Sequence, residues 1–331
     1  MNILITGAAG YIGSNLIVAL SGISEKVHIN AIDNFYSTKR QLFDATVKNL
    51  DINNKCDFYE MDFYDLERVV PLLEETDIVL HLAEEKEKRV YLEKSTLTSE
   101  KVMRWQKNVE GYRRLLEASI MCGVKRVILC SWAGVYVTSV KNKLSENEPL
   151  VPINQYYHQK ISQEYYSKMF ANEYLLDTVT LRMSNVYGVG PESSRWCVDS
   201  EPGVISVMIE SALRDEIIEV HNKGLQKRNF VHMDDVVDAL IRVIFYKGEF
   251  SGNTFNICSD EEKRIIDIAN WIAEMCSAKI HHKNVEWQKN IIQHPISNIR
   301  AKKVFGFHPS NNMRQRLLEI IERVRGAQDR I

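Results

Sequence analysis

The sequence predicts an α/β protein in which a doubly wound parallel sheet is followed by a smaller C-terminal α/β lobe. Short strand-like runs alternate with longer helical patterns over residues 1–183, which is typical of repeated β–α–β units. Runs without a regular polar alternation are typical of strands that helices cover on both faces. Beyond Tyr187 the alternation ends in a segment rich in Gly, Pro and Ser, residues 188–203.

The expected strands of the first half lie at residues 2–6, 28–33, 58–62, 77–83, 126–131 and 178–183. The spacing of apolar residues predicts helices at 16–20, 100–121, 155–172, 204–214, 233–246, 265–276 and 313–325. Asp234 and Asp235 suit the start of the helix at 233–246. We therefore divide the chain into residues 1–183, with a return segment near 229–258, and a second lobe that comprises mainly 184–331.

The chain has 331 residues, 45% of them hydrophobic, and 42 basic against 44 acidic side chains give a formal charge of −2. This length allows a sizeable core, and the balanced charge disfavours general binding to nucleic acids or anionic membranes. The six cysteines lie apart without metal-binding spacing, so we expect reduced thiols and no metal site. Because there is no basic leader and no apolar run of about 18 residues, we expect a soluble cytoplasmic protein.

Three glycines follow the first expected strand. Gly7 permits a tight turn, Gly10 lets the backbone approach a pyrophosphate, and Gly13 allows the next helix to pack closely on the strand. The positive end of that helix then binds phosphate. A glycine triplet alone is often a simple turn, but its place between the first strand and a helix predicts a dinucleotide site of the Rossmann type.

A carboxylate marks the adenosine end of this expected site. Asp33 ends the second strand, 20 residues beyond Gly13, where it can accept hydrogen bonds from a ribose and repel a 2′-phosphate. We therefore predict NAD rather than NADP as the cofactor. An ordinary turn residue at a strand end is the other interpretation of Asp33, and the nearby Lys39 and Arg40 leave NADP open.

Tyr156 and Lys160 stand four residues apart in an expected helix, so both side chains project from one face. An ammonium group beside a phenol favours the phenolate, which can exchange a proton with a sugar hydroxyl while hydride moves to the cofactor. Tyr156 is the only one of the 14 tyrosines with a lysine at this spacing. A solvated pair on a helix surface is the ordinary alternative.

Further segments accompany the glycine loop and the Tyr–Lys pair in a characteristic order, at residues 81–83, 108–111, 135–136, 181–188 and 228–236. Over nearly its whole length, the chain resembles an extended short-chain dehydrogenase/reductase of the nucleotide-sugar epimerase and dehydratase family. This resemblance implies a Rossmann-type domain that binds NAD and a C-terminal lobe that binds a nucleotide sugar.

The resemblance also implies roles for single residues. Tyr156 is the expected acid and base, and Lys160 favours its ionised form while binding the nicotinamide ribose. The residues expected to bind the cofactor are Gly7, Gly10, Tyr11, Ile12, Gly13, Asp33, Asn34, Asp62, Phe63, Leu82, Ala83, Asn108, Tyr156 and Lys160. Those expected to bind the substrate are Lys86, Trp132, Asn185, Val204, Val220 and Arg228.

One family position departs from the pattern. A Ser or Thr that hydrogen-bonds the reacting hydroxyl normally lies three residues before the Val135–Tyr136 pair, where this chain has Trp132. Ser131 is our candidate for the catalytic hydroxyl, although side chains alternate across a strand, and Tyr136 is another donor. Otherwise the site is reshaped for a different substrate or for reduced activity, since such a hydrogen bond is worth about 2.7–4 kcal/mol.

Ala133 and Gly134 bear on the type of reaction. Family dehydratases carry an Asp–Glu pair at these positions, and family decarboxylases use a Glu in the same turn. Without these carboxylates, the resemblance implies oxidation to a keto sugar and return of hydride to the other face, which is 4-epimerisation. A nucleotide-keto-sugar reductase would need the same residues, and an NAD-binding sensor or scaffold with little catalysis is the alternative of another class.

The second lobe supplies the expected substrate contacts. By resemblance, Asn185 contacts the diphosphate or the sugar, Arg228 binds a diphosphate oxygen, and backbone groups at 216–221 hold the base, most commonly uracil in UDP. A surface salt bridge is the alternative for Arg228. Residues 84–89 form a charge run, for which we expect either a solvated face or contacts of Glu84 or Lys86 with the sugar.

Two further expectations concern packing. His81 is expected to support the packing of its strand rather than to catalyse. The helices at 100–121 and 155–172 carry Tyr, Met and Leu on apolar faces. Family members often pair these helices across a dimer interface, so we expect a homodimer, with packing inside one subunit as the alternative.

Overall fold

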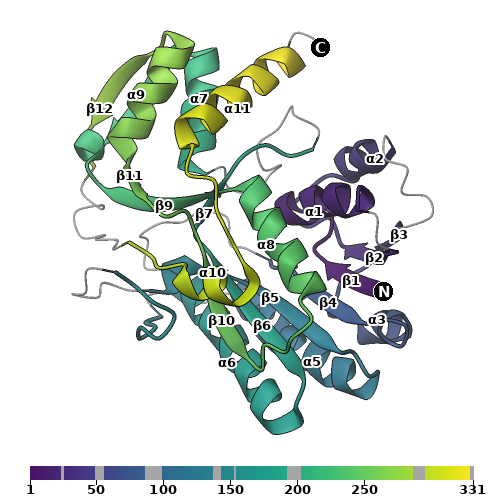
Figure 1. The fold of residues 1–331 in the computed structure, drawn as a ribbon. Helices are drawn as coiled ribbons and strands as arrows, with labels where there is room; N and C mark the ends of the chain where they lie inside the picture. The colour runs from purple at the N-terminus through teal and green to yellow at the C-terminus, as the bar shows by residue number, and fades with distance from the viewer. Residues whose placement is uncertain are drawn as a thin grey trace.

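The structure is a computed structural model that describes residues 1–23, 26–48, 56–85, 99–136, 143–152, 154–191, 203–285 and 295–328. Within these ranges, seven strands form one parallel sheet that has helices on both faces (Figure 1). The strand order across the sheet is β10-β6-β5-β4-β1-β2-β3. The predicted doubly wound α/β fold is therefore confirmed.

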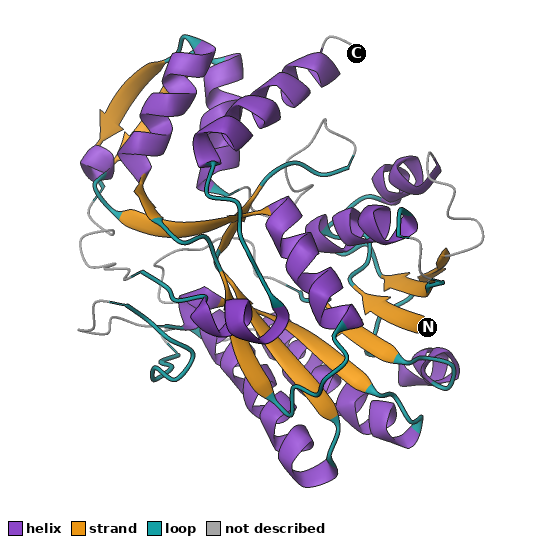
Figure 2. Cartoon of the chain, in the orientation of Figure 1, coloured by secondary structure: helices purple, strands orange, loops and turns teal. Residues whose placement is uncertain are grey.

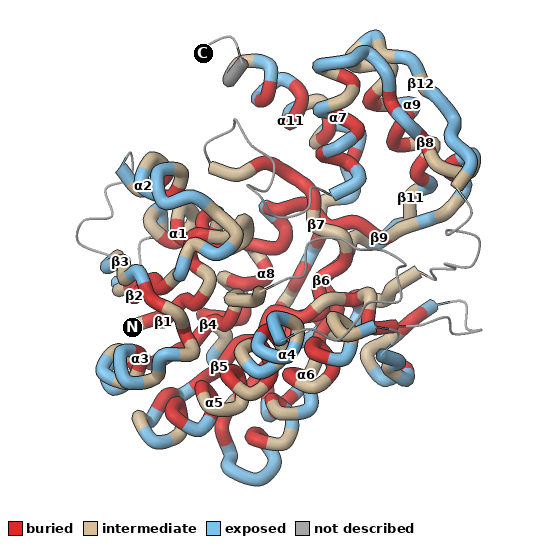
Figure 3. The backbone as a smooth tube through the Cα atoms, turned by 180° about the vertical axis from the view of Figure 1, so that it is seen from behind, coloured by how far each residue is buried: buried red, intermediate tan, exposed pale blue. Residues whose placement is uncertain are grey.

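The strands at the centre of the main sheet are buried on both faces. Their bounds are β1 Asn2–Thr6, β2 His28–Asp33, β3 Cys56–Glu60, β4 Ile78–His81, β5 Arg126–Trp132, β6 Asp177–Met183 and β10 Asn253–Ile257. In β1, Ile3 and Ile5 join one apolar core and Leu4 joins the other, because side chains alternate across a strand. The centre of the molecule is buried accordingly (Figure 3), whereas the edge strand β3 is partly exposed.

Two helical layers cover the main sheet (Figure 2). One layer contains α1 (Tyr11–Ser21), α2 (Arg40–Lys48), α8 (Met233–Phe245) and α10 (Ile299–Phe305). The other layer contains α3 (Leu66–Leu73), α5 (Gly111–Met121) and α6 (Gln155–Tyr174). The chain returns to the main sheet late, since β10 follows α8 and pairs with β6.

The C-terminal lobe lies above the main sheet in Figure 1. One small sheet contains β7 (Asn185–Tyr187), β9 (Lys227–His232) and β11 (Glu262–Arg264), and the other contains β8 (Ile217–His221) and β12 (Lys279–Lys283). The helices α7 (Val204–Arg214), α9 (Ile265–Cys276) and α11 (Met313–Gln328) enclose a separate apolar core against these strands. This lobe therefore has its own packing.

Several predicted elements have the observed bounds, namely β1, β2, α7 and α9. The predicted strand at 58–62 lies two residues earlier, as β3, and the strand expected at 77–83 is shorter, as β4. The prediction of one α-helix at 100–121 is wrong. There, α4 (Ser99–Trp105) passes into a π-helical turn, Gln106–Glu110, before α5 begins. None of the helices in the described ranges is both long and apolar enough to span a membrane.

Candidate active site

The glycine loop joins β1 to α1. Gly7 has a φ of +68°, and a Cβ on it would lie 2.7 Å from the backbone nitrogen of Ala83, just after β4. A Cβ on Gly13 would lie 2.6 Å from the carbonyl oxygen of Ala8. Both positions therefore require glycine. No side chain caps α1 at Gly10, so the positive end of this helix is available to a phosphate.

The other two predicted loop residues, Tyr11 and Ile12, lie on the first turn of α1. The side chain of Ile12 packs against the core of the main sheet. The hydroxyl oxygen of Tyr11 lies beside Gly188, where a Cβ would be 3.3 Å from it. The first turn of α1 thus reaches the chain segment that follows β7.

Asp33 lies at the end of β2, next to the glycine loop. Its carboxylate accepts hydrogen bonds from the backbone amides of Ala9, at 3.0 Å, and Phe35, at 2.7 Å. Burial raises the pKa of this carboxyl group, while the hydrogen bonds oppose that rise. Asn34 follows, and its amide donates to Asp62 at 3.3 Å. Three predicted cofactor residues are therefore close together.

Arg40, which left NADP open in the sequence, has carboxylate partners of its own. Its guanidinium lies 2.6 Å from Glu60 and 3.5 Å from Asp44. A 2′-phosphate is usually held by an arginine near this point of the fold. Because Arg40 is already paired, and because Asp33 presents a carboxylate here, the arrangement favours NAD.

The end of β4 lies against the glycine loop. His81 is buried, stacked on Tyr112, and edge-on to Phe63. Burial lowers the pKa of this imidazole to about 3, with a smaller contribution from the charge of a nearby lysine. His81 therefore supports packing, as expected. Leu82 and Ala83 follow it beside Gly7.

The interpretation of the charge run as a solvated face is wrong at its first two residues. The Glu84 carboxylate lies 3.0 Å from the ammonium of Lys160, and its side chain is only 5% exposed. The Glu85 carboxylate lies 2.7 Å from the ammonium of Lys107. The side chain of Asn108 accepts a hydrogen bond from the Glu85 amide and donates one to the Glu85 carbonyl. Both carboxylates point inward because a buried cation, Lys160, and a partly buried one, Lys107, lie beside them.

Tyr156 and Lys160 lie one turn apart on α6. The side chain of Asn154 caps the start of this helix, which is a usual role for Asn. Lys160 is buried, and its ammonium donates to the carbonyl of Cys130 on β5 at 3.1 Å. The half-buried ring of Tyr156 lies with its centre 5.6 Å from that of Trp132. The phenol, the ammonium and the indole are therefore grouped where α6 meets the end of β5.

The two proposed replacements for the family Ser or Thr have other partners. Ser131 donates to Glu164 at 2.5 Å. Tyr136 donates to Asn256 and accepts from Arg182, both at 2.7 Å. Side chains alternate along β5, so Ser131 and Trp132 point in opposite directions. This placement does not support Ser131 as the catalytic hydroxyl.

The predicted substrate residues lie on several elements. The side chain of Asn185 on β7 donates to the carbonyl of Asn229 on β9 at 2.9 Å. Val204 is exposed at the start of α7. Val220 is fully buried on β8, an edge strand, so only its backbone can face a base. Lys86 lies outside the described residues.

Arg228 lies on β9 and is partly buried. Burial lowers the pKa of its guanidinium, while Tyr157 and Glu262 nearby oppose this shift. The ring of Tyr157 is centred 5.1 Å from that of Trp132. An arginine of the second lobe therefore lies near the start of α6, the helix that carries Tyr156 and Lys160.

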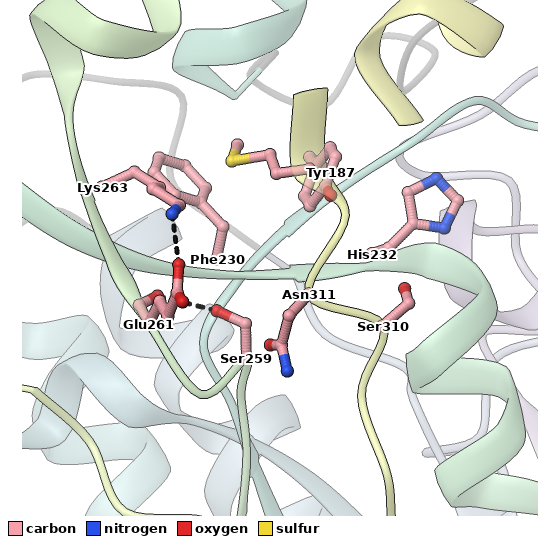
Figure 4. A pocket seen from close by; sticks show the side chains of 9 residues that line it. Tyr187, Phe230, His232, Ser259, Glu261, Lys263, Ser310 and Asn311 are labelled. Atoms are coloured by element: carbon pink, nitrogen blue, oxygen red, sulfur yellow. Dashed lines mark hydrogen bonds and ion pairs between the residues drawn. The ribbon is translucent and has the colours of Figure 1, made fainter. Parts of the chain in front are cut away.

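A small hollow in the C-terminal lobe lies between β9, the turn before β11 and the segment before α11 (Figure 4). Its lining residues are Tyr187, Phe230, His232, Ser259, Glu261, Lys263, Ser310, Asn311 and Met313. Lys263 pairs with Glu261 there. None of the predicted site residues lines this hollow, so it does not coincide with the predicted site.

Four residues that shape the site were not predicted from the sequence, namely Lys107, Tyr157, Glu164 and Arg182. Glu164 and Arg182 form a buried ion pair at 2.6 Å. The sequence does indicate Glu164, because it follows Lys160 by four residues, the same spacing that separates Tyr156 from Lys160. Lys107 and Tyr157 adjoin recognised residues, but nothing in the local pattern indicates their partners.

The fold, the glycine loop and the helix with Tyr156 and Lys160 define a dinucleotide-binding protein of the short-chain dehydrogenase/reductase class. Residues 3–258 match the model of the NAD dependent epimerase/dehydratase family. The chain belongs to this family. The predicted family is therefore confirmed, and so is NAD as its cofactor.

Individual relatives cover almost the whole chain. The chain is 27% identical over 328 residues to the UDP-glucose 4-epimerase of Mycolicibacterium smegmatis, with 97% of this chain and 98% of that protein covered. It is 28% identical over 304 residues to the dTDP-D-glucose 4,6-dehydratase of Mus musculus, with 90% and 79% covered. The crystal structure of UDP-glucuronic acid 4-epimerase from Bacillus cereus with NAD superposes with a TM-score of 0.82, at 23% identity and 99% coverage of both chains. This last likeness supports the fold alone.

Proposed function

We propose that this protein is an NAD-dependent nucleotide-sugar epimerase that inverts C4 of the sugar through a transient 4-keto sugar. The observation that carries the proposal is the turn beside Tyr156, formed by Trp132, Ala133 and Gly134. A Cβ on Gly134 would lie 2.4 Å from the indole of Trp132, so position 134 has no room for a side chain beside this indole. Elimination needs an acid and a base at the sugar, and this turn supplies neither.

The residues of the site fit NAD. Gly7 and Gly13 leave spaces that a Cβ would fill, and we assign the pyrophosphate to this loop. Asp33 and Asn34 would hold the adenosine ribose. Glu84 Oε1 is buried without a partner among the described residues, so an unused acceptor remains beside Lys160. When bound at this site, NAD would supply the acceptor and then the donor of the C4 hydride, with no net redox change.

Tyr156 is assigned the proton transfers. Its phenolate oxygen accepts the proton of the C4 hydroxyl as the C4–H bond gives up hydride, and a carbonyl forms. After the keto sugar rotates, hydride returns to the opposite face and Tyr156 returns the proton to the oxygen. Lys160 favours the phenolate through its positive charge. Arg228 binds the diphosphate, for which a guanidinium fork is well suited.

A panel of UDP-, GDP-, CDP- and dTDP-sugars tests this proposal when the purified protein is incubated without added NAD(P)H and the products are separated. Tyr156→Phe is expected to lower turnover by about 10²–10⁴-fold and to leave NAD bound. Tyr174→Phe is the matched control, because Tyr174 lies exposed at the end of the same helix. Full activity in Tyr156→Phe would overturn the assignment of the acid and base.

The same panel of sugars, assayed both with and without added NAD(P)H, separates the alternatives. Interconversion of two sugars without consumption of cofactor supports the epimerase. Stoichiometric loss of added NAD(P)H supports the keto-sugar reductase instead. NAD binding without turnover of any sugar in the panel supports a sensor or scaffold.

Finer features are also part of the proposal. We propose residues 1–183 as the main cofactor domain and 184–331 as the main nucleotide-sugar lobe. A UDP-sugar is the proposed substrate, because the relative from M. smegmatis acts on UDP-glucose by its name.

A cytoplasmic homodimer that serves carbohydrate biosynthesis is proposed as well. Val102, Met103 and Tyr165 on α4 and α6 are large, apolar or aromatic, and exposed, and sedimentation equilibrium tests whether a second subunit covers them.

A further inference from the structure

The lysine of the proposed catalytic pair has a buried counter-ion. The ammonium of Lys160 lies 3.0 Å from Glu84 Oε2 and 3.1 Å from the carbonyl oxygen of Cys130. The two side chains are 7% and 5% exposed. Two of the three ammonium protons thus have acceptors in the described part of the chain. Water screens little at such low exposure, so the charge of Glu84 acts strongly on its surroundings.

The other titratable groups around Lys160 do not balance its charge. His81, at the end of β4, is held neutral because burial lowers its pKa to about 3. The thiol of Cys130 on β5 is neutral because burial raises its pKa to about 12. Glu164, the next acidic residue on α6, is bound to Arg182. Among the described residues, Glu84 is therefore the carboxylate that balances Lys160.

Glu84 is fixed by contacts of its neighbour. The Asn108 side chain holds both backbone groups of Glu85, at 3.0 and 2.9 Å. The Glu85 carboxylate adds a contact with Lys107 at 2.7 Å, which a glutamine at this position can keep as a hydrogen bond from the ammonium to its amide oxygen. Asn108 and Lys107 both lie on the π-helical turn between α4 and α5, and such turns are frequent at functional sites. The loop therefore presents the Glu84 side chain to Lys160 from a fixed backbone.

We propose that Glu84 is a positioning residue that sets the charge beside Tyr156, because its carboxylate offsets the Lys160 ammonium and so raises the pH at which the phenol becomes an active base. This inference rests on the proposed roles of Tyr156 and Lys160. A lone ammonium favours the phenolate, whereas a nearby carboxylate disfavours it. Removal of the carboxylate charge should therefore let Tyr156 ionise at lower pH.

The test compares Glu84→Gln with Glu85→Gln. The two variants remove the same charge from adjacent positions, but only Glu84 is paired with Lys160. The first measurement uses the purified protein without any sugar. Tyrosinate absorbance is followed against pH, and the same titration in the Tyr156→Phe background is subtracted to isolate one phenol. In Glu84→Gln this ionisation should move down by about one pH unit or more, and in Glu85→Gln it should stay in place.

The second measurement follows turnover against pH. The acidic limb of kcat/KM should move to lower pH by the same amount in Glu84→Gln, with that of Glu85→Gln unchanged. Glu84→Asp keeps the charge and should restore the limb of the original protein, which a merely structural role would not do. Because the Glu84→Gln substitution leaves Lys160 without its counter-ion, that variant can fold poorly. Glu84→Ser, which removes the same charge with a smaller side chain, is then titrated in its place and should give the same downward shift of the phenol ionisation.

Two results would overturn the inference. The first is an unchanged phenol titration in folded Glu84→Gln, and the second is an equal shift in the Glu85→Gln control. Failure of the proposed function is recognisable separately, because the phenol titration needs no substrate. If the phenol titration shifts in Glu84→Gln but no sugar is turned over, the epimerase proposal is refuted and the inference stands. If turnover requires Tyr156 but its pH dependence is unchanged in Glu84→Gln, the inference is refuted and the epimerase proposal stands.

Discussion

Two buried ion pairs lie against α6, one helical turn apart, and they differ in how completely they are bonded. Glu164 accepts a hydrogen bond from Ser131 at 2.5 Å and is held by Arg182 through contacts of 2.6 to 3.1 Å on both oxygens. Glu84, in contrast, meets Lys160 through one oxygen. Its other oxygen has no partner among the described residues.

This difference in bonding indicates a structural role for the Glu164–Arg182 pair and a role in the proposed site for the Glu84–Lys160 pair. A buried polar network in which every group is bonded makes its surroundings rigid, and the Glu164–Arg182 pair accordingly joins α6 to β6. A buried pair with an unused acceptor is costly unless another donor completes it. The Glu84–Lys160 pair is therefore suited to a site where a ligand supplies that donor, next to Tyr156.

The largest expected effect comes from breaking the fully bonded pair. Glu164→Gln leaves the Arg182 guanidinium without its buried carboxylate, and we expect a loss of about 3–5 kcal/mol in the free energy of unfolding. Urea denaturation followed by circular dichroism measures this loss. Glu117→Gln is the control, because Glu117 pairs with Arg113 on α5 while 48% exposed, and screened surface pairs contribute little. Equal losses in the two variants would contradict a supporting role for the Glu164–Arg182 pair.

Ser131→Ala should have a smaller effect on stability, and it tests whether Ser131 stabilises the fold or takes part in catalysis. Loss of a hydrogen bond to a carboxylate should cost about 1.5–3 kcal/mol of unfolding free energy, with turnover within a few-fold of the original. Ser119→Ala is the control, since Ser119 is buried and donates to a neutral carbonyl, that of Leu115, at 2.7 Å. A fall in kcat of about 10²–10³-fold with unchanged stability would instead make Ser131 the catalytic hydroxyl.

The centre of the main sheet could be predicted because strands that are buried on both faces are rich in apolar residues, and β1 and β2 have the predicted bounds. The end of β4 could not be predicted. Leu82 and Ala83 are as apolar as a strand, but the Ala83 amide donates to the side chain of Thr6 rather than to the strand ladder. The π-helical turn at Gln106–Glu110 was also beyond prediction, since one extra residue hardly changes helical spacing.

The candidate site was predictable only where its residues are neighbours in the sequence. Tyr156 and Lys160 share one helix face, so spacing alone reveals them. The contact of Lys160 with Glu84 joins residues 76 positions apart, and no local pattern reports it. From the sequence, the charge run that begins at Glu84 is interpreted as a solvated face, because the sequence does not show that Lys107 and Lys160 lie beside it.

The smallest expected effect is a change in stability with pH, and it arises from His81, which lies near Lys160. His81 has a folded-state pKa of about 3 because it is buried and faces the charge of Lys160, against about 6.5 in an unfolded chain. Between these two values the unfolded chain binds a proton that the folded protein does not, so stability falls as the pH falls.

The original protein should therefore lose about 1 kcal/mol more unfolding free energy than His81→Gln does when the pH falls from about 6.5 to about 5.5. Urea denaturation at the two pH values measures this difference. His308→Gln is the control, because His308 is exposed, and it should keep the pH dependence of the original protein. An identical pH dependence in His81→Gln would mean that the imidazole is protonated in the folded state, and Lys160 would then face a second positive charge that Glu84 alone does not balance.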